Sequence, residues 1–191
     1  MAAGDRMPPL DREHLTSEQA AALDRITAGP RGALVGPFTV LLRTPELMNR
    51  VQEVGAFLRY EKLLEPRLFE MTVLMVARHW DQGFEWGHHH PLALAAGLDP
   101  EVVQAVGEER RPASRDPAVQ VLWQVVDQIH RTHRVSDETF AEAVALFGEQ
   151  CLVELVVAVG YYTTLAMVMN VARTPPEEGA PLPARSTEPH P

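Results

Sequence analysis

Apolar residues recur at intervals of three and four along most of the chain, which is the spacing of one face of an α-helix. Segment 116–133 is the clearest example, with an apolar face made by Val119, Leu122, Val126 and Ile129. The alternation that is typical of strands is scarce. The pattern therefore predicts an all-α protein, a compact bundle of several helices.

Capping residues and helix breakers divide this pattern into separate helices. Thr16 or Ser17 is suited to cap the first, and Asp99 and Ser136 are suited to cap two later ones. The region 29–45 is rich in glycine and proline and predicts an irregular loop. The helices are expected over about 17–28, 45–64, 66–82, 84–97, 100–109, 116–133, 137–147 and 150–172.

The last of these helices, 150–172, is apolar on all sides, which predicts a central position in the bundle. We expect residues 13–173 to form a single helical domain, preceded by a flexible N-terminus over residues 1–12. The segment 174–191 is rich in proline and has little to bury, so it predicts a disordered tail or one draped over the surface.

Composition narrows the classes of partner. The 191 residues carry a net charge of −9, which argues against nucleic acid or an anionic membrane as the main partner. The longest apolar run, 152–159, is shorter than the roughly 20 residues that a membrane span needs. Residues 1–15 lack the basic start and apolar core of a signal peptide, so we expect a cytoplasmic protein. With Cys151 as its one cysteine, the chain has no intramolecular disulfide.

The stretch 70–89, EMTVLMVARHWDQGFEWGHH, holds the main candidates for chemistry. Glu70 lies in an almost wholly apolar helix, and ionisable groups are rarely buried without a partner. One interpretation is an acid or base whose pKa is raised by burial. The alternative is a structural carboxylate paired with Arg67, with Arg78 or with a histidine.

Glu85, His88 and His89 form the second part of the candidate site. On a helix, Glu85 is three positions from His88 and four from His89, so both imidazoles can reach its carboxylate. A carboxylate that orients an imidazole fixes its tautomer and raises its basicity, as a general base requires. Three successive histidines cannot all point inward, and His90, which precedes Pro91, is the weakest candidate.

The same groups are of the types that bind zinc or iron. Their spacing, however, matches neither His-Glu-x-x-His nor a repeated Glu-x-x-His pair, so we expect no metal. Cys151 is expected to be a small core residue. Tyr161, Tyr162 and Asn170 lie in the apolar last helix, where one of them is expected to line the pocket.

Several stretches resemble the cysteine-free members of the carboxymuconolactone decarboxylase and alkylhydroperoxidase D-like (AhpD-like) superfamily. These are GPFTVLLRTPEL, LRYEKLLEPRLFEMTVLMVARHW, FEWGHHHPLALAAGL and GYYTTLAMVMN, and the resemblance covers about residues 10–173. In the peroxidase branch, a glutamate precedes a Cys-x-x-Cys-x-x-x-His motif. Glu70 fits that glutamate and His89 the histidine, whereas Gln82 and Glu85 occupy the cysteine positions.

The resemblance implies an oligomeric all-helical domain, commonly a trimer or a multiple of one, with a pocket lined by the glutamate and histidine positions. The decarboxylase branch uses no cofactor and acts on a carboxylated lactone. Carried over, His89 would be the general acid–base, Glu85 its orienting partner or a second acid, and Glu70 the carboxylate that tunes both. We expect His88, Trp86 and Tyr161 to bind substrate.

The leading hypothesis is therefore a cofactor-independent lyase or isomerase acting on a small carboxylated lactone or related carbonyl compound. A metal-dependent enzyme with Glu85 and His89 as ligands, and a non-catalytic binding or assembly protein, are the alternatives. Without the two cysteines, the thiol peroxidase cycle of disulfide formation and reduction is not available.

Overall fold

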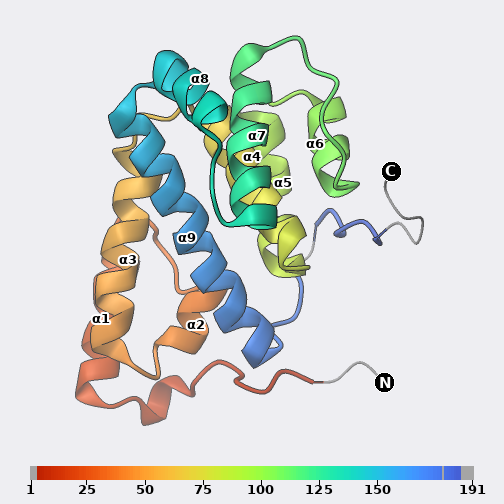
Figure 1. Cartoon of the computed structure of the whole chain (residues 1–191). Helices are drawn as coiled ribbons and strands as arrows, with labels where there is room; N and C mark the ends of the chain where they lie inside the picture. Colours follow the sequence, from red (N-terminus) through yellow and green to blue (C-terminus); the bar gives the residue numbers. More distant parts are fainter. Residues whose placement is uncertain (1–3, 178, 186–191) are drawn as a thin grey trace.

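The computed structural model describes residues 4–177 and 179–185, and within them the secondary structure is helical with no strand, as predicted (Figure 1). The elements are a 3₁₀ turn, η1 (Arg12–His14), and the helices α1 (Ser17–Ala28), α2 (Pro37–Leu41), α3 (Pro45–Tyr60), α4 (Pro66–His79), α5 (Gly83–Ala95), α6 (Pro100–Gly107), α7 (Pro117–Thr132), α8 (Asp137–Phe147) and α9 (Glu149–Ala172).

The helices begin at the residues that the capping pattern indicated. Thr16 forms a capping box with Gln19 at the start of α1. The side chains of Asp99 and Ser136 accept hydrogen bonds from the first backbone N–H groups of α6 and α8. Proline occupies the first turn of α3 and α4, where its missing N–H costs nothing.

Two boundaries differ from the prediction. The region predicted as a loop contains α2, which is only five residues long and begins with a proline that also fits a first helical turn. Burial of Phe38 and Leu41, together with contacts to α9, stabilises this short helix through tertiary packing. Helix α3 ends at Tyr60, and Leu64 reaches the core from the following loop.

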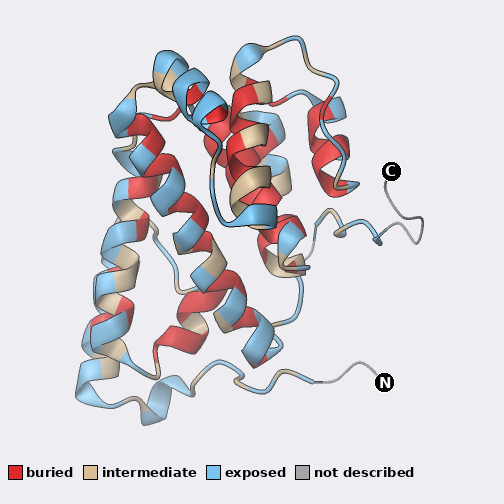
Figure 2. Cartoon of the chain, in the orientation of Figure 1, coloured by how far each residue is buried: buried red, intermediate tan, exposed pale blue. Residues whose placement is uncertain are grey.

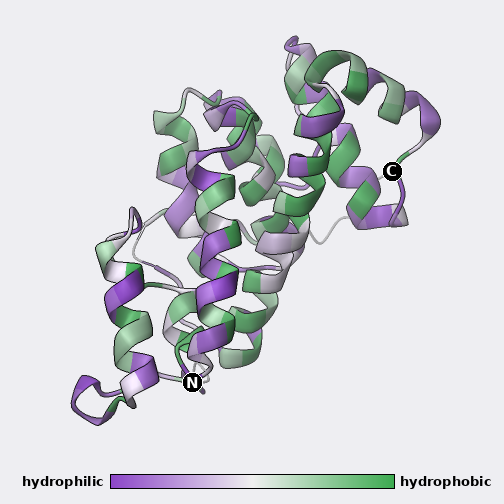
Figure 3. Ribbon diagram, turned by 90° about the vertical axis from the view of Figure 1, so that its left-hand side faces the viewer, coloured by the Kyte–Doolittle hydropathy of each residue, from purple (hydrophilic) through white to green (hydrophobic). Residues whose placement is uncertain are grey.

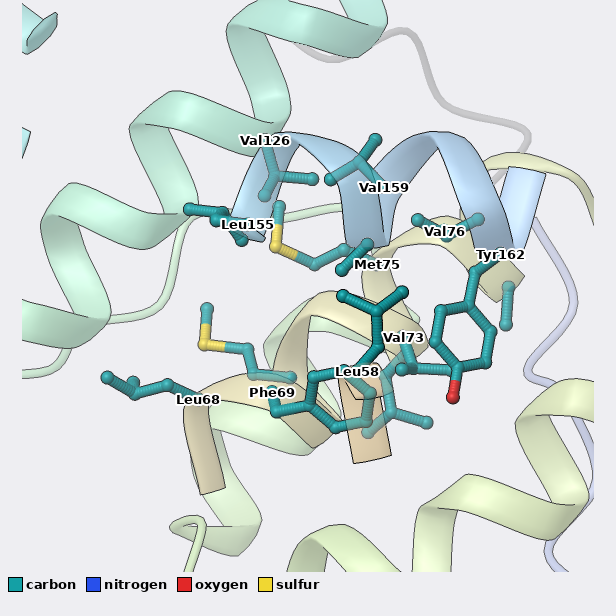
Figure 4. Close-up of a cluster of buried hydrophobic side chains, with 14 of the residues drawn as sticks. Leu58, Leu68, Phe69, Val73, Met75, Val76, Val126, Leu155, Val159 and Tyr162 are labelled. Carbon is teal, nitrogen blue, oxygen red and sulfur yellow. The ribbon is translucent and has the colours of Figure 1, made fainter. Parts of the chain in front are cut away.

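The central helix is α4 and not α9, so that prediction was wrong. Every residue of α4 from Leu68 to Arg78 is buried, and the helix contacts α5, α6, α7 and α9 (Figure 2). On α9, by contrast, Val153 and Val171 are each 62% exposed. Where the two helices meet, the ring of Phe69 on α4 lies edge-on to that of Tyr162 on α9, with centroids 5.8 Å apart (Figure 4).

Helix α9 is long and apolar enough to cross a membrane by length and composition, and 44% of its apolar window is buried in the protein. A core helix of a soluble protein satisfies the same criterion. Helix α9 contacts α2, α3, α4 and α8. It also buries Glu154, whose carboxylate accepts a hydrogen bond from the backbone N–H of Leu63 at 2.8 Å.

The described part of the C-terminal segment, 174–177 and 179–185, makes specific contacts with the helical body. Glu177 bonds to His88 on α5, and the carbonyl of Pro183 accepts a hydrogen bond from Arg78. Arg185 forms an ion pair with Asp81 at 2.8 Å. The rest of the segment for which we predicted disorder, residues 178 and 186–191, lies outside the described residues, as do residues 1–3 of the predicted flexible N-terminus.

Because α4 carries the core, Leu74→Ala is expected to lower the free energy of unfolding by about 2–5 kcal/mol. Leu74 is fully buried, so the truncation removes apolar contact and leaves a cavity. Urea unfolding followed by circular dichroism measures the loss. Leu47→Ala on α3 is the matched control, since Leu47 is 51% exposed. Equal losses in the two variants would contradict a core centred on α4.

Candidate active site

The turn between α4 and α5 is fixed by side-chain hydrogen bonds. The side-chain oxygen of Gln82 accepts from the backbone N–H of Phe84 at 2.7 Å, and its amide donates to Asn170 Oδ1 at 2.8 Å. Asn170 in turn donates to the carbonyl of Trp80 at 2.8 Å. This network attaches the start of α5 to α9, so the side chains on the two elements keep a defined relative position.

Glu70 and His89 form a buried hydrogen-bonded pair that joins α4 to α5. His89 Nδ1 lies 2.6 Å from Glu70 Oε2, with the imidazole 4% and the carboxylate 12% exposed. Of the partners that the sequence offered to Glu70, the structure selects the histidine. Arg67 is occupied by Glu65 and Asp116, and Arg78 by Asp81.

The environment favours an uncharged His89. Burial lowers the pKa of its imidazole, against the opposing effects of the hydrogen bond and charge of Glu70. In a neutral ring that donates Nδ1–H to Glu70, the second nitrogen, Nε2, is an acceptor. The edge-on ring of Tyr162, 5.3 Å away between centroids, helps to hold the imidazole plane. The result is a histidine set up as a base.

Glu85 does not orient His89, which corrects the role expected from their i,i+4 spacing. No hydrogen bond or ion pair joins Glu85 to His88 or His89, and within the described chain Glu85 Oε2 is buried without a hydrogen-bond partner. Burial raises the pKa of this carboxyl well above its ordinary value, which favours its protonated form. Glu70 takes over the orienting role, and Glu85 is left as an acid.

Glu85 and His89 meet at a small cavity of about 30 Å³, enough for about one water molecule. Its lining comes from α2, α3, α5, α9 and the loop before α2, and comprises Arg31, Val35, Pro37, Phe38, Arg59, Phe84, Glu85, His88, His89, Tyr161, Tyr162 and Leu165. Glu70 is not part of the lining and acts on the cavity through His89. Side chains from five elements therefore converge on one acid and one base.

Arg31 and Arg59 are the cavity residues that sequence reasoning missed. Both are half-buried, and neither takes part in an ion pair among the residues that the structure describes. The Arg31 guanidinium lies 4.3 Å from the centroid of the Phe38 ring. No local motif marks either arginine, because each lies on an element other than α4 and α5 and reaches the cavity only through tertiary packing.

Tyr161 brings a hydroxyl to the same cavity, as expected of the last helix. Its oxygen is buried with no hydrogen-bond partner in the described chain, and burial raises its pKa to about 12, so it stays protonated. Gly55 on α3 makes room for it, since a side chain at Gly55 would collide with the hydroxyl.

The side chains of His88 and Trp86 lie in different parts of the structure. His88 lines the cavity, stacks on Phe84, and has Nδ1 2.8 Å from Glu177 Oε2. Trp86 is absent from the lining: it is buried on another face of α5, against Gly107 of α6. The structure therefore brings His88 and Tyr161, but not Trp86, to the cavity. Residues 4–177 and 179–185 contain no group of three His, Cys, Asp or Glu side chains arranged to hold a metal ion.

No family model matches the chain, and no curated protein matches it. Among solved structures, it is similar to a protein of unknown function from Agrobacterium tumefaciens, proposed to be an antioxidant defence protein, AhpD. The match has a TM-score of 0.64 and 17% sequence identity, and covers 72% of this chain and 94% of the other. At that identity the likeness shows the fold alone: this protein has an AhpD-like fold.

Proposed function

We propose that this protein is a lyase or isomerase that acts on a small carboxylated lactone or a related carbonyl compound by proton transfer. The observation that carries the proposal is the buried Glu70–His89 pair beside a cavity that is also lined by the buried, unpaired carboxyl of Glu85. A base and an acid with opposite protonation states at one pH are what proton transfer next to a carbonyl requires.

His89 is the base in the proposed reaction. Its Nε2 removes a proton from the carbon next to the substrate carbonyl, and the electron pair of the broken C–H bond passes into the carbonyl group to give an enolate. Glu70 stabilises the imidazolium that forms, through the hydrogen bond to Nδ1. In a decarboxylation, the electron pair of the broken C–CO₂ bond forms the enolate instead.

Glu85 is the proton donor in the proposed reaction, because burial favours its protonated form, and it becomes charged on giving its proton to carbon. The Tyr161 hydroxyl is a protonated donor without a partner in the described chain, so it is available to bind the enolate oxygen. These two groups use polar atoms that the resting structure leaves unsatisfied.

The arginines account for a carboxylated substrate. Arg31 and Arg59 bring positive charge to the cavity without an ion-pair partner in the described chain, and guanidinium groups bind carboxylates by paired hydrogen bonds. The cavity is smaller than a lactone, so binding requires outward movement of lining side chains. The two half-buried arginines are the long, flexible members of that lining.

The antioxidant role proposed for the Agrobacterium protein has a different chemical requirement. A thiol peroxidase cycle needs two cysteines, and Gln82 and Glu85 stand at the motif positions here. Cys151 is buried at the start of α9, where burial raises the pKa of its thiol and so disfavours the reactive thiolate.

Turnover of a panel of carboxylated lactones, followed by ultraviolet absorbance and carbon dioxide release, tests the proposal. His89→Gln is expected to lower kcat by about 10²-fold or more, because the base is lost. Glu70→Gln should lower it as well, with a changed pH profile, since the orienting carboxylate is gone. His90→Gln is the control from the same histidine run. A wild-type protein without turnover, or a His89→Gln variant with full turnover, would refute the assignment.

The buried Glu85 should also make the stability of the protein depend on pH. Below the unfolded-state pKa of about 4.5, the Glu85 carboxyl is protonated in both the folded and the unfolded protein. Between that value and the raised folded-state pKa, only the unfolded protein loses the proton. The stability of the folded protein therefore falls as pH rises through this range. Glu85→Gln removes this penalty. At about pH 8 we expect the variant to be more stable than wild type, and at about pH 4 equally stable. Chemical denaturation at both pH values measures this; a variant less stable at the higher pH would show that Glu85 is ionised.

We also propose that the protein forms a homo-oligomer, in which α9 of one copy faces α9 of another. Val153, Val157, Gly160, Thr164, Met167 and Val171 are exposed and follow one another at alternating steps of four and three, the spacing of a helix–helix seam. In Figure 3, hydrophobic residues (green) and hydrophilic residues (purple) are intermixed along the helices. Exposed apolar surface of this extent marks an interaction site on a soluble protein.

The double variant Val153→Glu/Val157→Glu should dissociate the oligomer, because it places like charges along the seam. Size-exclusion chromatography with light scattering measures the mass. Phe140→Glu on α8 is the control, since Phe140 is also exposed, at 51%, and lies off the seam. A monomeric wild-type protein would contradict the proposed interface.

A further inference from the structure

A second and larger cavity, of about 300 Å³, lies between α4, α6 and α7. It shares no residue with the cavity at Glu85 and His89. Met75, Val106 and Trp123 form its apolar lining. Ligand sites in proteins are concave, mostly apolar and furnished with a few convergent polar groups, and they begin at about this volume.

The wall of this cavity also contains unsatisfied polar atoms. Within the described chain, Arg78 Nε and His130 Nε2 are buried without a hydrogen-bond partner. Both residues line the cavity. Buried polar groups without partners are rare in folded proteins. The same property marks Glu85 and Tyr161 at the candidate active site.

Arg78 is held in place by its other nitrogens. Its side chain is 3% exposed, with one terminal nitrogen 2.7 Å from Asp81 Oδ1 and the other donating to the carbonyl of Pro183. The nearest carboxylate to Nε is that of Glu109, at 3.8 Å, beyond hydrogen-bond distance, and Arg185 already holds Glu109 at 3.1 Å. The guanidinium is therefore preorganised, and its Nε–H has no hydrogen-bond acceptor in the described chain.

His130 is stacked on His79, with ring centroids 4.1 Å apart and planes 12° from parallel. Burial, and next the charge of His79, lower the pKa of His130 to about 4, so the ring is neutral at neutral pH. A neutral imidazole with its proton on Nε2 donates one hydrogen bond. Arg78 Nε and, in that tautomer, His130 Nε2 are thus two donors that can bind an acceptor such as a carboxylate.

The rim of this cavity also carries negatively charged side chains. Asp127 and Glu109 line the cavity together with Arg131, whose guanidinium is 3.9 Å from Asp127 and 76% exposed. Burial raises the pKa of Asp127, which means that its charge lacks solvation and gains from a cation nearby. With Arg78, the lining therefore carries two positive and two negative side chains around an apolar floor.

From this arrangement we propose that the α4–α6–α7 cavity binds a zwitterionic amino acid with an aromatic side chain. Its carboxylate accepts from Arg78 and His130, its ammonium group binds Asp127, and its side chain packs on Trp123. A ligand of zero net charge matches a lining of zero net charge. It provides both an acceptor for Arg78 and His130 and a cation for Asp127. The proposal does not depend on the reaction at His89.

Isothermal titration calorimetry of the full-length protein with three related probes tests the site. L-phenylalanine carries both charged groups, 3-phenylpropanoate lacks the ammonium group, and 2-phenylethylamine lacks the carboxylate. We expect L-phenylalanine to bind, and each analogue to bind at least about tenfold more weakly, because a charge-assisted hydrogen bond is lost. An analogue that binds as tightly as L-phenylalanine, or the absence of binding by all three at millimolar concentration, would overturn the proposal.

Variants locate the binding. His130→Gln and Asp127→Asn should each weaken L-phenylalanine about tenfold. Asp137→Asn, an exposed position on α8, is the matched control and should leave the affinity unchanged. Circular dichroism confirms that each variant is folded, and imidazole nuclear magnetic resonance of wild-type protein gives an independent readout, since the His130 signals should shift on addition of L-phenylalanine. Unchanged affinity in both cavity variants, or unmoved His130 signals, would show that the amino acid does not occupy this cavity.

Discussion

The 2.6 Å hydrogen bond between Glu70 and His89 is the interaction on which the organisation of the active-site region depends. Glu70 lies in the most buried helix of the protein, where an ionisable group without a partner would be very costly. His89 meets that requirement and in doing so joins α5 to α4 at a fixed register. The same contact satisfies a structural demand and sets the tautomer of a base.

Glu85, unlike Glu70, is buried in this region without a hydrogen-bond partner for its Oε2 in the described chain. Its raised pKa is the direct consequence of that burial, and the loss of stability at neutral pH is the cost. Sites that perform chemistry often retain groups that the fold alone would not favour. The second cavity repeats the feature, since Arg78 and His130 are buried there with donors unused.

The part of the site that the sequence predicted is the part that lies within a short stretch of chain. Glu70, Glu85, His88 and His89 were identified because one apolar helix contains a carboxylate and the next begins with a carboxylate and histidines. The pairing itself was predicted wrongly. Helical spacing favoured Glu85 as the partner of His89, whereas packing of α5 on α4 brought Glu70 closer.

By itself, the sequence determined the all-helical class, most helix starts and the residues of the acid–base cluster, because caps, prolines and apolar spacing act over one or two turns. Only the tertiary structure decided that α4 and not α9 is central, that Arg31, Arg59 and Tyr161 share a cavity with His89, and that Trp86 turns away from it. These outcomes depend on which face of each helix is covered by elements far away in the chain. The sequence of an apolar helix does not show whether another part of the same fold or a second subunit covers it.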